Sequence, residues 1–212
     1  MNLPNKLTVL RICLIPLFLF FMIASFPGEN GELICRIAAA ALFLGTAITD
    51  FLDGYLARKY KLITDFGKFL DPLADKMMVL GAMFGLVVLA TSDTGLAGSV
   101  YMRLTATAGF VVLVRELAVT SLRLAASGST GVVIAANILG KVKTVSQIVF
   151  VMIALLEPIV FGKLLPMLWS PLGVVAEYHI LSYISMVEMT VMTVWSGLGY
   201  FKAYFPLINS NK

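Results

Sequence analysis

The chain has 212 residues, of which 59% are hydrophobic and 13% are charged, and its formal net charge is +4. Charged residues make up about a quarter of an ordinary soluble domain, so this composition, with a mean hydropathy of +0.94, excludes a soluble globular protein. It predicts an all-α integral membrane protein. No linker, repeat or low-complexity tract divides the chain, so we expect a single membrane domain over residues 1–212. The small positive charge argues for membrane orientation rather than nucleic-acid binding.

The first predicted membrane helix covers residues 7–26, which matches the roughly 20 residues that a hydrocarbon core requires. The preceding MNLPNK is typical of a short N-terminal interfacial segment, with Pro4 as a helix-start signal. Arg11 lies near the end of this helix, and we expect its side chain to extend to the membrane surface.

The second and third helices are too short unless they include charged residues. Residues 37–49 are uncharged, but this run cannot cross a bilayer alone, so the second helix must continue through Asp50 and Asp53 to about residue 58. The third uncharged run begins after Lys76, and its helix must begin earlier. Asp71 and Asp75 therefore fall at the membrane boundary.

Three more helices follow. The fourth extends from about residue 104 toward Arg123, and the fifth runs from Lys141 to Glu157-Pro158, where we expect the chain to leave the bilayer. The sixth covers about residues 178–204 and carries Glu188 near mid-depth, to which we assign no catalytic role. The sequence thus predicts six transmembrane helices.

Lysine and arginine residues gather on one side of this topology. Thirteen of the sixteen lie on the side of the N-terminus, and the positive-inside rule then places both termini in the cytoplasm. The charged ends of helices two to five converge on that side. Ionisable groups at membrane depth usually face a bundle interior or a water-filled cavity, so we expect a polar cavity open to the cytoplasm.

Helical periodicity groups the acids of residues 50–75. At 100° per residue, one face of the second helix carries Asp50, Asp53, Gly54 and Ala57. Asp71 and Asp75 are one turn apart on the third helix. Clustered carboxylates repel one another unless cations are present, and Mg²⁺ suits sites made of carboxylates and substrate phosphates. A pair of such ions can support displacement at phosphorus.

Neighbouring residues suit a phosphate-containing ligand. Gly54 and Ala57 leave space beside the helix, and Arg58 is a planar donor that suits phosphate oxygens. The alternative is a solvated hairpin in which the acids pair with nearby lysine and arginine residues. The acids lie on inward-facing sides of the second and third helices. This placement argues against that alternative, because acids at membrane depth are usually functional.

The same segment reads D-x2-D-G-x2-A-R-x8-G-x3-D-x3-D from Asp50 to Asp75, and it resembles the signature of the CDP-alcohol phosphotransferase family. NLPNKLTVLRICLIP, GKFLDPLADK, VRELAVTSLR and LGKVKT resemble the bacterial branch that uses CDP-diacylglycerol and sn-glycerol 3-phosphate. The resemblance implies a homodimeric enzyme of the bacterial cytoplasmic membrane, with its active site facing the cytoplasm. It would form phosphatidylglycerol phosphate and CMP, with two Mg²⁺ or Mn²⁺ ions.

The resemblance also implies roles for individual residues. Asp50, Asp53 and Asp71 would bind metal, and Asp75 would bind the second metal and act as general base. The donor's cytidine diphosphate would be held by Gly54, Ala57, Arg58 and Gly67, with Asn5 and Thr8 as weaker candidates for polar contacts.

The acceptor's phosphate requires fixed cations near the same end of the bundle. The candidates are Arg115, Arg123, Lys141 and Lys143, although any one of them could instead serve orientation or pair with Glu116.

Two other functions remain open. The acceptor could be another alcohol, such as inositol phosphate, serine or phosphatidylglycerol. The acids could also belong to a divalent-cation transporter, but such a site should lie near the membrane midplane, whereas these acids cluster at one end.

Overall fold

The structure is a computed structural model that describes residues 3–24, 26–27, 30–60, 65–91, 95–130, 138–167 and 170–209. Every regular element in these ranges is a helix. The long helices are α1 (Leu3–Ile23), α2 (Gly31–Lys59), α3 (Asp65–Ala90), α4 (Leu96–Thr130), α5 (Ile138–Ile159) and α7 (Ile180–Asn209). The short elements are the π-helical turn η1 (Val160–Leu164), the 3₁₀ turns η2 (Leu165–Met167) and η3 (Ser170–Leu172), and α6 (Gly173–Glu177).

Four of the described helical segments are long and apolar enough to cross a membrane: Asn5–Ile23, Gly31–Tyr55, Phe69–Ala90 and Ile138–Met167. A helix satisfies its own backbone hydrogen bonds, which lipid cannot do. The chain is therefore a helical membrane protein. The described helices α4 and α7 are not among these four segments, so the count of six spans stays a prediction.

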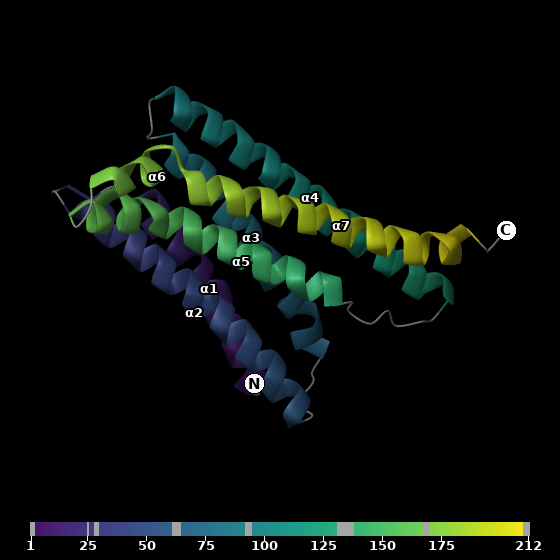
Figure 1. The fold of residues 1–212 in the computed structure, drawn as a ribbon. Helices are drawn as coiled ribbons and strands as arrows, with labels where there is room; N and C mark the ends of the chain where they lie inside the picture. Colours follow the sequence, from purple (N-terminus) through teal and green to yellow (C-terminus); the bar gives the residue numbers. More distant parts are fainter. Residues whose placement is uncertain are drawn as a thin grey trace.

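The long helices run back and forth between two ends of the bundle (Figure 1). The end of α2, the start of α3 and the start of α5 lie at the same end as the N-terminus. The short α6 lies at the opposite end. The acid-bearing parts of α2 and α3 therefore share one end of the molecule.

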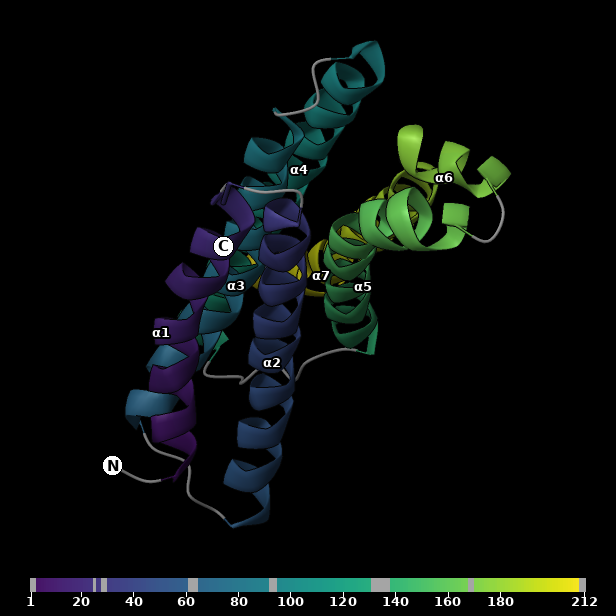
Figure 2. The same ribbon diagram turned by 90° about the vertical axis from the view of Figure 1, so that its left-hand side faces the viewer.

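Helix α1 lies between α2 and α3 and contacts both. It packs extensively against both, whereas α2 and α3 make few direct contacts with each other; Figure 2 shows α1 and α2 side by side. Phe18 of α1 meets Phe43 of α2 edge to face, with ring centroids 5.6 Å apart. On the other side, a Cβ at Gly85 of α3 would lie 2.9 Å from the Met22 side chain, so glycine permits the close approach of α1 and α3.

The N-terminal interfacial segment predicted from the sequence is not separate from the first helix. Helix α1 is continuous from Leu3, and its candidate span begins at Asn5. Proline is tolerated in the first turn, where its missing N–H would have no helical partner. Pro4 thus lies in the first turn of α1, as expected of a helix-start signal, and the position of the membrane surface along this segment stays a prediction.

The fifth α-helix ends one residue beyond the predicted end at Glu157-Pro158. The α-helix continues to Ile159 and passes into η1. Glu157 is only 2% exposed and accepts hydrogen bonds from the backbone N–H groups of Leu181 and Ser182, at 2.8 and 2.9 Å, as well as from the Ser182 hydroxyl. The first N–H groups of a helix have no partner within it, so this acid caps α7.

Candidate functional site

The four predicted metal-binding acids lie on α2 and α3, and their surroundings differ. Asp53 is buried, whereas the side chain of Asp50, almost one turn earlier on α2, is 40% exposed. Asp71 and Asp75 of α3 are partly buried. The cluster thus has a side turned toward solvent at Asp50 and a side enclosed by protein at Asp53.

Arg11 of α1 binds both acids of α2. Its Nη1 lies 2.7 Å from Oδ1 of Asp50, and its Nη2 is paired with Oδ2 of Asp53. The Arg11 side chain is 0% exposed, so the expectation that it extends to the membrane surface was wrong. The physical reason is that α1 packs against the acidic face of α2, where two carboxylates offer the guanidinium better partners than the membrane surface does.

Thr8 of the same helix binds the next acid. Its hydroxyl donates a hydrogen bond of 2.6 Å to Oδ1 of Asp71 on α3. Thr8 and Arg11 are three residues apart and share one face of α1, and buried Asn5 is three residues earlier on that face. One polar face of α1 therefore contacts acids from both neighbouring helices.

Asp75 lies where this acid cluster meets the basic residues of α4 and α5. Its carboxylate is within electrostatic range of Asp50 and Arg11, and also of Lys143 and Glu116. Its Oδ1 is buried and has no hydrogen-bond partner among the described residues. This oxygen is available to a ligand or a proton.

Two of the four predicted acceptor-binding residues meet at Glu116 of α4. Lys143 of α5 is buried and paired with Oε1 of Glu116, and Arg115 approaches the same oxygen at 3.0 Å. Arg115 also donates a 2.7 Å hydrogen bond to Ser196 of α7, and its guanidinium lies 5.6 Å from the Tyr200 ring centre. These cations are held in place by α4, α5 and α7.

The other two predicted acceptor-binding residues, Arg123 and Lys141, are exposed, and the structure does not bring them to Glu116. Among the predicted donor-binding residues, Gly67 is buried and Gly54 is partly buried. Ala57 and Arg58 belong to α2, but their side chains lie outside the described part of the chain.

The chemistry of the acids fits a divalent cation, because carboxylates are hard oxygen ligands and Asp75 offers a buried oxygen without a hydrogen-bond partner. In the arrangement described, however, no three His, Cys, Asp or Glu side chains lie close enough together to hold one ion. Arg11 supplies positive charge to Asp50 and Asp53. A shared metal site would require the acids of α2 and α3 to draw closer together.

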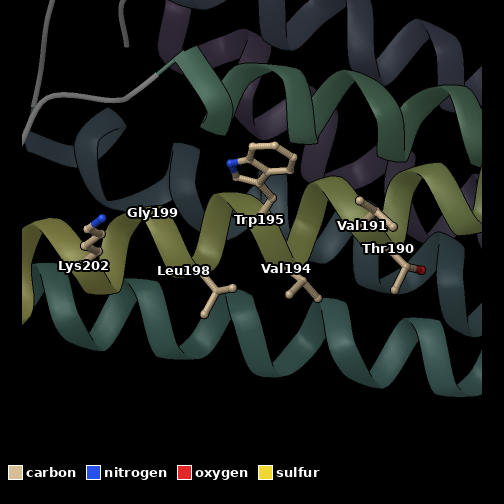
Figure 3. Close-up of a pocket in the computed structure, with 7 residues that line it drawn as sticks. All are labelled: Thr190, Val191, Val194, Trp195, Leu198, Gly199 and Lys202. Carbon is tan, nitrogen blue, oxygen red and sulfur yellow. The ribbon is translucent and has the colours of Figure 1, made fainter.

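An apolar groove of about 620 Å³ lies on α7, away from the acids (Figure 3). Its lining residues are Thr190, Val191, Val194, Trp195, Leu198, Gly199 and Lys202. Trp195 and Leu198 are both more than 60% exposed. A groove of this composition suits contact with apolar groups, so we do not place the chemistry here.

The pairing with Glu116 that the sequence offered as an alternative is confirmed for Arg115 and Lys143, but sequence reasoning missed the role of Arg11. A signal for Arg11 was present, because Asn5, Thr8 and Arg11 recur at intervals of three in an otherwise apolar helix. Such spacing places them along one helix face. Nothing in the spacing showed which other helix that face would meet.

Taken together, these features define a polytopic helical membrane protein with a carboxylate cluster at one end of its bundle. The model of the CDP-alcohol phosphatidyltransferase family matches residues 1–195, and the chain belongs to this family. The family generally depends on a divalent metal ion.

Individual relatives match most of the chain. A Bacillus subtilis protein named CDP-diacylglycerol–glycerol-3-phosphate 3-phosphatidyltransferase is 45% identical over 166 residues, which are 76% of this chain and 79% of that protein. Proteins of the same name from Pseudomonas fluorescens and Yersinia pestis are 33% and 34% identical. Their matches cover 100% and 96% of this chain, and 94% of each relative.

Proposed function

We propose that the protein transfers the phosphatidyl group from CDP-diacylglycerol to sn-glycerol 3-phosphate, giving phosphatidylglycerol phosphate and CMP in phospholipid biosynthesis. The observation that carries this proposal is the similarity, over most of the chain, to relatives named for this reaction. The acid cluster at one end of a membrane bundle supports it. A lipid donor and a soluble acceptor can meet at that depth.

We assign the acids to metal and proton chemistry. Asp50, Asp53, Asp71 and Asp75 would hold two Mg²⁺ or Mn²⁺ ions, which when bound neutralise charge on the donor's diphosphate. Gly54, Ala57, Arg58 and Gly67 would receive the cytidine diphosphate, and Asn5 and Thr8 would make further polar contacts. Thr8 already engages Asp71, so its primary role would be to orient that acid.

Asp75 is the proposed general base. Its unpartnered buried oxygen would take the proton from the primary hydroxyl of glycerol 3-phosphate. The hydroxyl oxygen then forms a bond to the phosphatidyl phosphorus, and the bond from that phosphorus to the CMP oxygen breaks. Protein groups supply orientation and electrostatic stabilisation, as in phosphoryl transfer generally.

The acceptor's phosphate would bind beside α4 and α5. Arg115 and Lys143 share Glu116, which fixes their positions but also neutralises part of their charge. The exposed cations Lys141 and Arg123 would therefore attract the incoming dianion, and Arg115 and Lys143 would line the inner part of its path.

We further propose six transmembrane helices, with both termini and the active site on the cytoplasmic side of the bacterial cell membrane. Residues 1–212 would form a single catalytic domain, and two copies would form a homodimer. The common placement of the α2 end, the α3 start and the α5 start in Figure 1 supports this orientation, because the basic residues of the chain concentrate there.

A purified-protein assay tests the reaction. The protein in detergent or liposomes is given CDP-diacylglycerol, Mg²⁺ or Mn²⁺, and one acceptor at a time, and CMP release is measured. We expect CMP with glycerol 3-phosphate and little with inositol phosphate, serine or phosphatidylglycerol. Preference for another acceptor would change the substrate, and no CMP with any of them would contradict the enzyme class.

A further inference from the structure

Three acids of the cluster are bound by one helix, and a single cation serves two of them. Arg11 bridges Asp50 and Asp53, and Thr8 holds Asp71. Because α2 and α3 contact each other little, α1 is the element that connects the two acidic segments.

The cluster needs such a cation for electrostatic reasons. Neighbouring carboxylates at membrane depth repel one another, and an uncompensated buried charge is costly. A guanidinium with two parallel donors can satisfy two carboxylates at once, which a lysine ammonium does less well. Arg11 can therefore hold both Asp50 and Asp53 in place.

The same contacts oppose binding of a divalent cation. The guanidinium occupies oxygens that a metal ion would use, and its positive charge repels the ion at short range. Asp50 is 40% exposed on its other side, so an ion can approach from solvent while Arg11 holds the acids from within the protein. Among the described residues, Nη2 of Arg11 donates a hydrogen bond to Asp53, whereas Nη1 contacts Asp50 only as an ion pair and Nε has no hydrogen-bond partner.

We propose that Arg11 is a built-in counter-ion that competes with the divalent metal for Asp50 and Asp53, and so sets the metal affinity of the site. It orders the acids before the metal binds and lowers the affinity of the site for the metal ion. The inference rests on the proposed metal-dependent function and adds a positioning residue on α1 to the acids of α2 and α3.

The test measures Mn²⁺ binding to purified protein without substrates, by the electron paramagnetic resonance signal of free Mn²⁺. Arg11→Gln should lower the Kd for Mn²⁺ by about tenfold or more, because a nearby positive charge has been removed. Arg11→Lys should give a smaller decrease, since an ammonium cannot bridge both carboxylates as the guanidinium does. The matched control is Arg103→Gln, an exposed arginine of α4, which should leave the Kd unchanged.

Thermal unfolding gives a second readout. Metal-free Arg11→Gln should unfold at a lower temperature than the wild type, and Mn²⁺ should raise its unfolding temperature by more than it raises that of the wild type. If Arg11→Gln does not fold, the Kd of Arg11→Lys decides.

The opposite sign of the effect would overturn the proposal. If Arg11 only positions the acids, its removal should raise the Kd for Mn²⁺. A raised or unchanged Kd in both variants would reject the proposed competition between Arg11 and the metal ion, although the metal site itself would stand. If neither the wild type nor the variants bind Mn²⁺, this inference fails, whereas the proposed reaction is tested separately by CMP release from CDP-diacylglycerol and glycerol 3-phosphate. Because substrates are absent, an incorrect acceptor assignment would not affect the result.

Discussion

Asp75 differs from the other acids of the cluster in what surrounds its carboxylate. Asp50 and Asp53 are paired with Arg11, and Asp71 accepts a hydrogen bond from Thr8. Asp75 has a buried oxygen without a hydrogen-bond partner in the described structure. An acid that is not already neutralised is the best placed of the four to accept a proton.

We therefore expect Asp75→Asn to lower the rate of CMP release by at least about a hundredfold, the scale of general-base catalysis. An amide cannot take the hydroxyl proton, while donor binding through the other acids should largely persist. Single-turnover CMP release and CDP-diacylglycerol binding separate the two effects. The control is Glu32→Gln, an exposed acid that is paired with Arg36 on the same helix. Turnover like that of the wild type in Asp75→Asn would remove Asp75 as the base.

Among the cations, Lys141 should affect substrate capture rather than the chemical step. It is exposed, whereas Lys143 and Arg115 are engaged by Glu116. Loss of one charged contact to a phosphate should raise the KM for glycerol 3-phosphate about tenfold with little change in kcat. Lys163→Ala, at an exposed position in η1, is the control. Unchanged kinetics in Lys141→Ala would leave Lys141 a role in membrane orientation only.

At the scale of helices, the clearest tertiary contact outside the site is the cap that Glu157 of α5 forms on the start of α7. Glu157 binds two backbone N–H groups and a hydroxyl at the start of α7. His179, just before α7, has a φ of 49° and stacks on Tyr101 of α4 with ring centres 4.3 Å apart. The start of α7 is thereby attached to both α4 and α5.

Glu157→Gln should destabilise the protein by about 1–3 kcal/mol, because the amide keeps one acceptor and leaves a buried donor group unsatisfied. Thermal unfolding in detergent measures the change, and the KM for both substrates should stay close to that of the wild type. Glu177→Gln at an exposed position of α6 should have no comparable effect. An unfolding temperature equal to that of the wild type in Glu157→Gln would show that the cap contributes little.

For the whole molecule, the proposed orientation can be tested at two exposed positions. In a background without Cys13 and Cys35, a cysteine is placed at Tyr60 or at Glu177, both exposed. A membrane-impermeant maleimide should label position 177 but not position 60 in intact spheroplasts, and the reverse should hold in inverted vesicles. Labelling of position 60 from outside would contradict a cytoplasmic active site.

Much of the helical framework could be predicted from local sequence, because a bilayer requires a minimum apolar length. That requirement extended the second and third helices through their acids, and α2 and α3 do include all four of them. The error came at Arg11, whose side chain was expected at the membrane surface but is buried. The deciding factor was which carboxylates the guanidinium meets, which local sequence does not show.

The sequence by itself determined the membrane class, the helical spacing of the acids and the family signature, since these depend on composition and short-range periodicity. Only the tertiary structure decided which cation meets which acid. Arg11 and Asp53 are 42 residues apart in the chain, and Thr8 and Asp71 are 63 apart. These pairs form because α1 packs between the two acidic helices, and helix packing depends on side-chain shape along whole faces rather than on any local pattern.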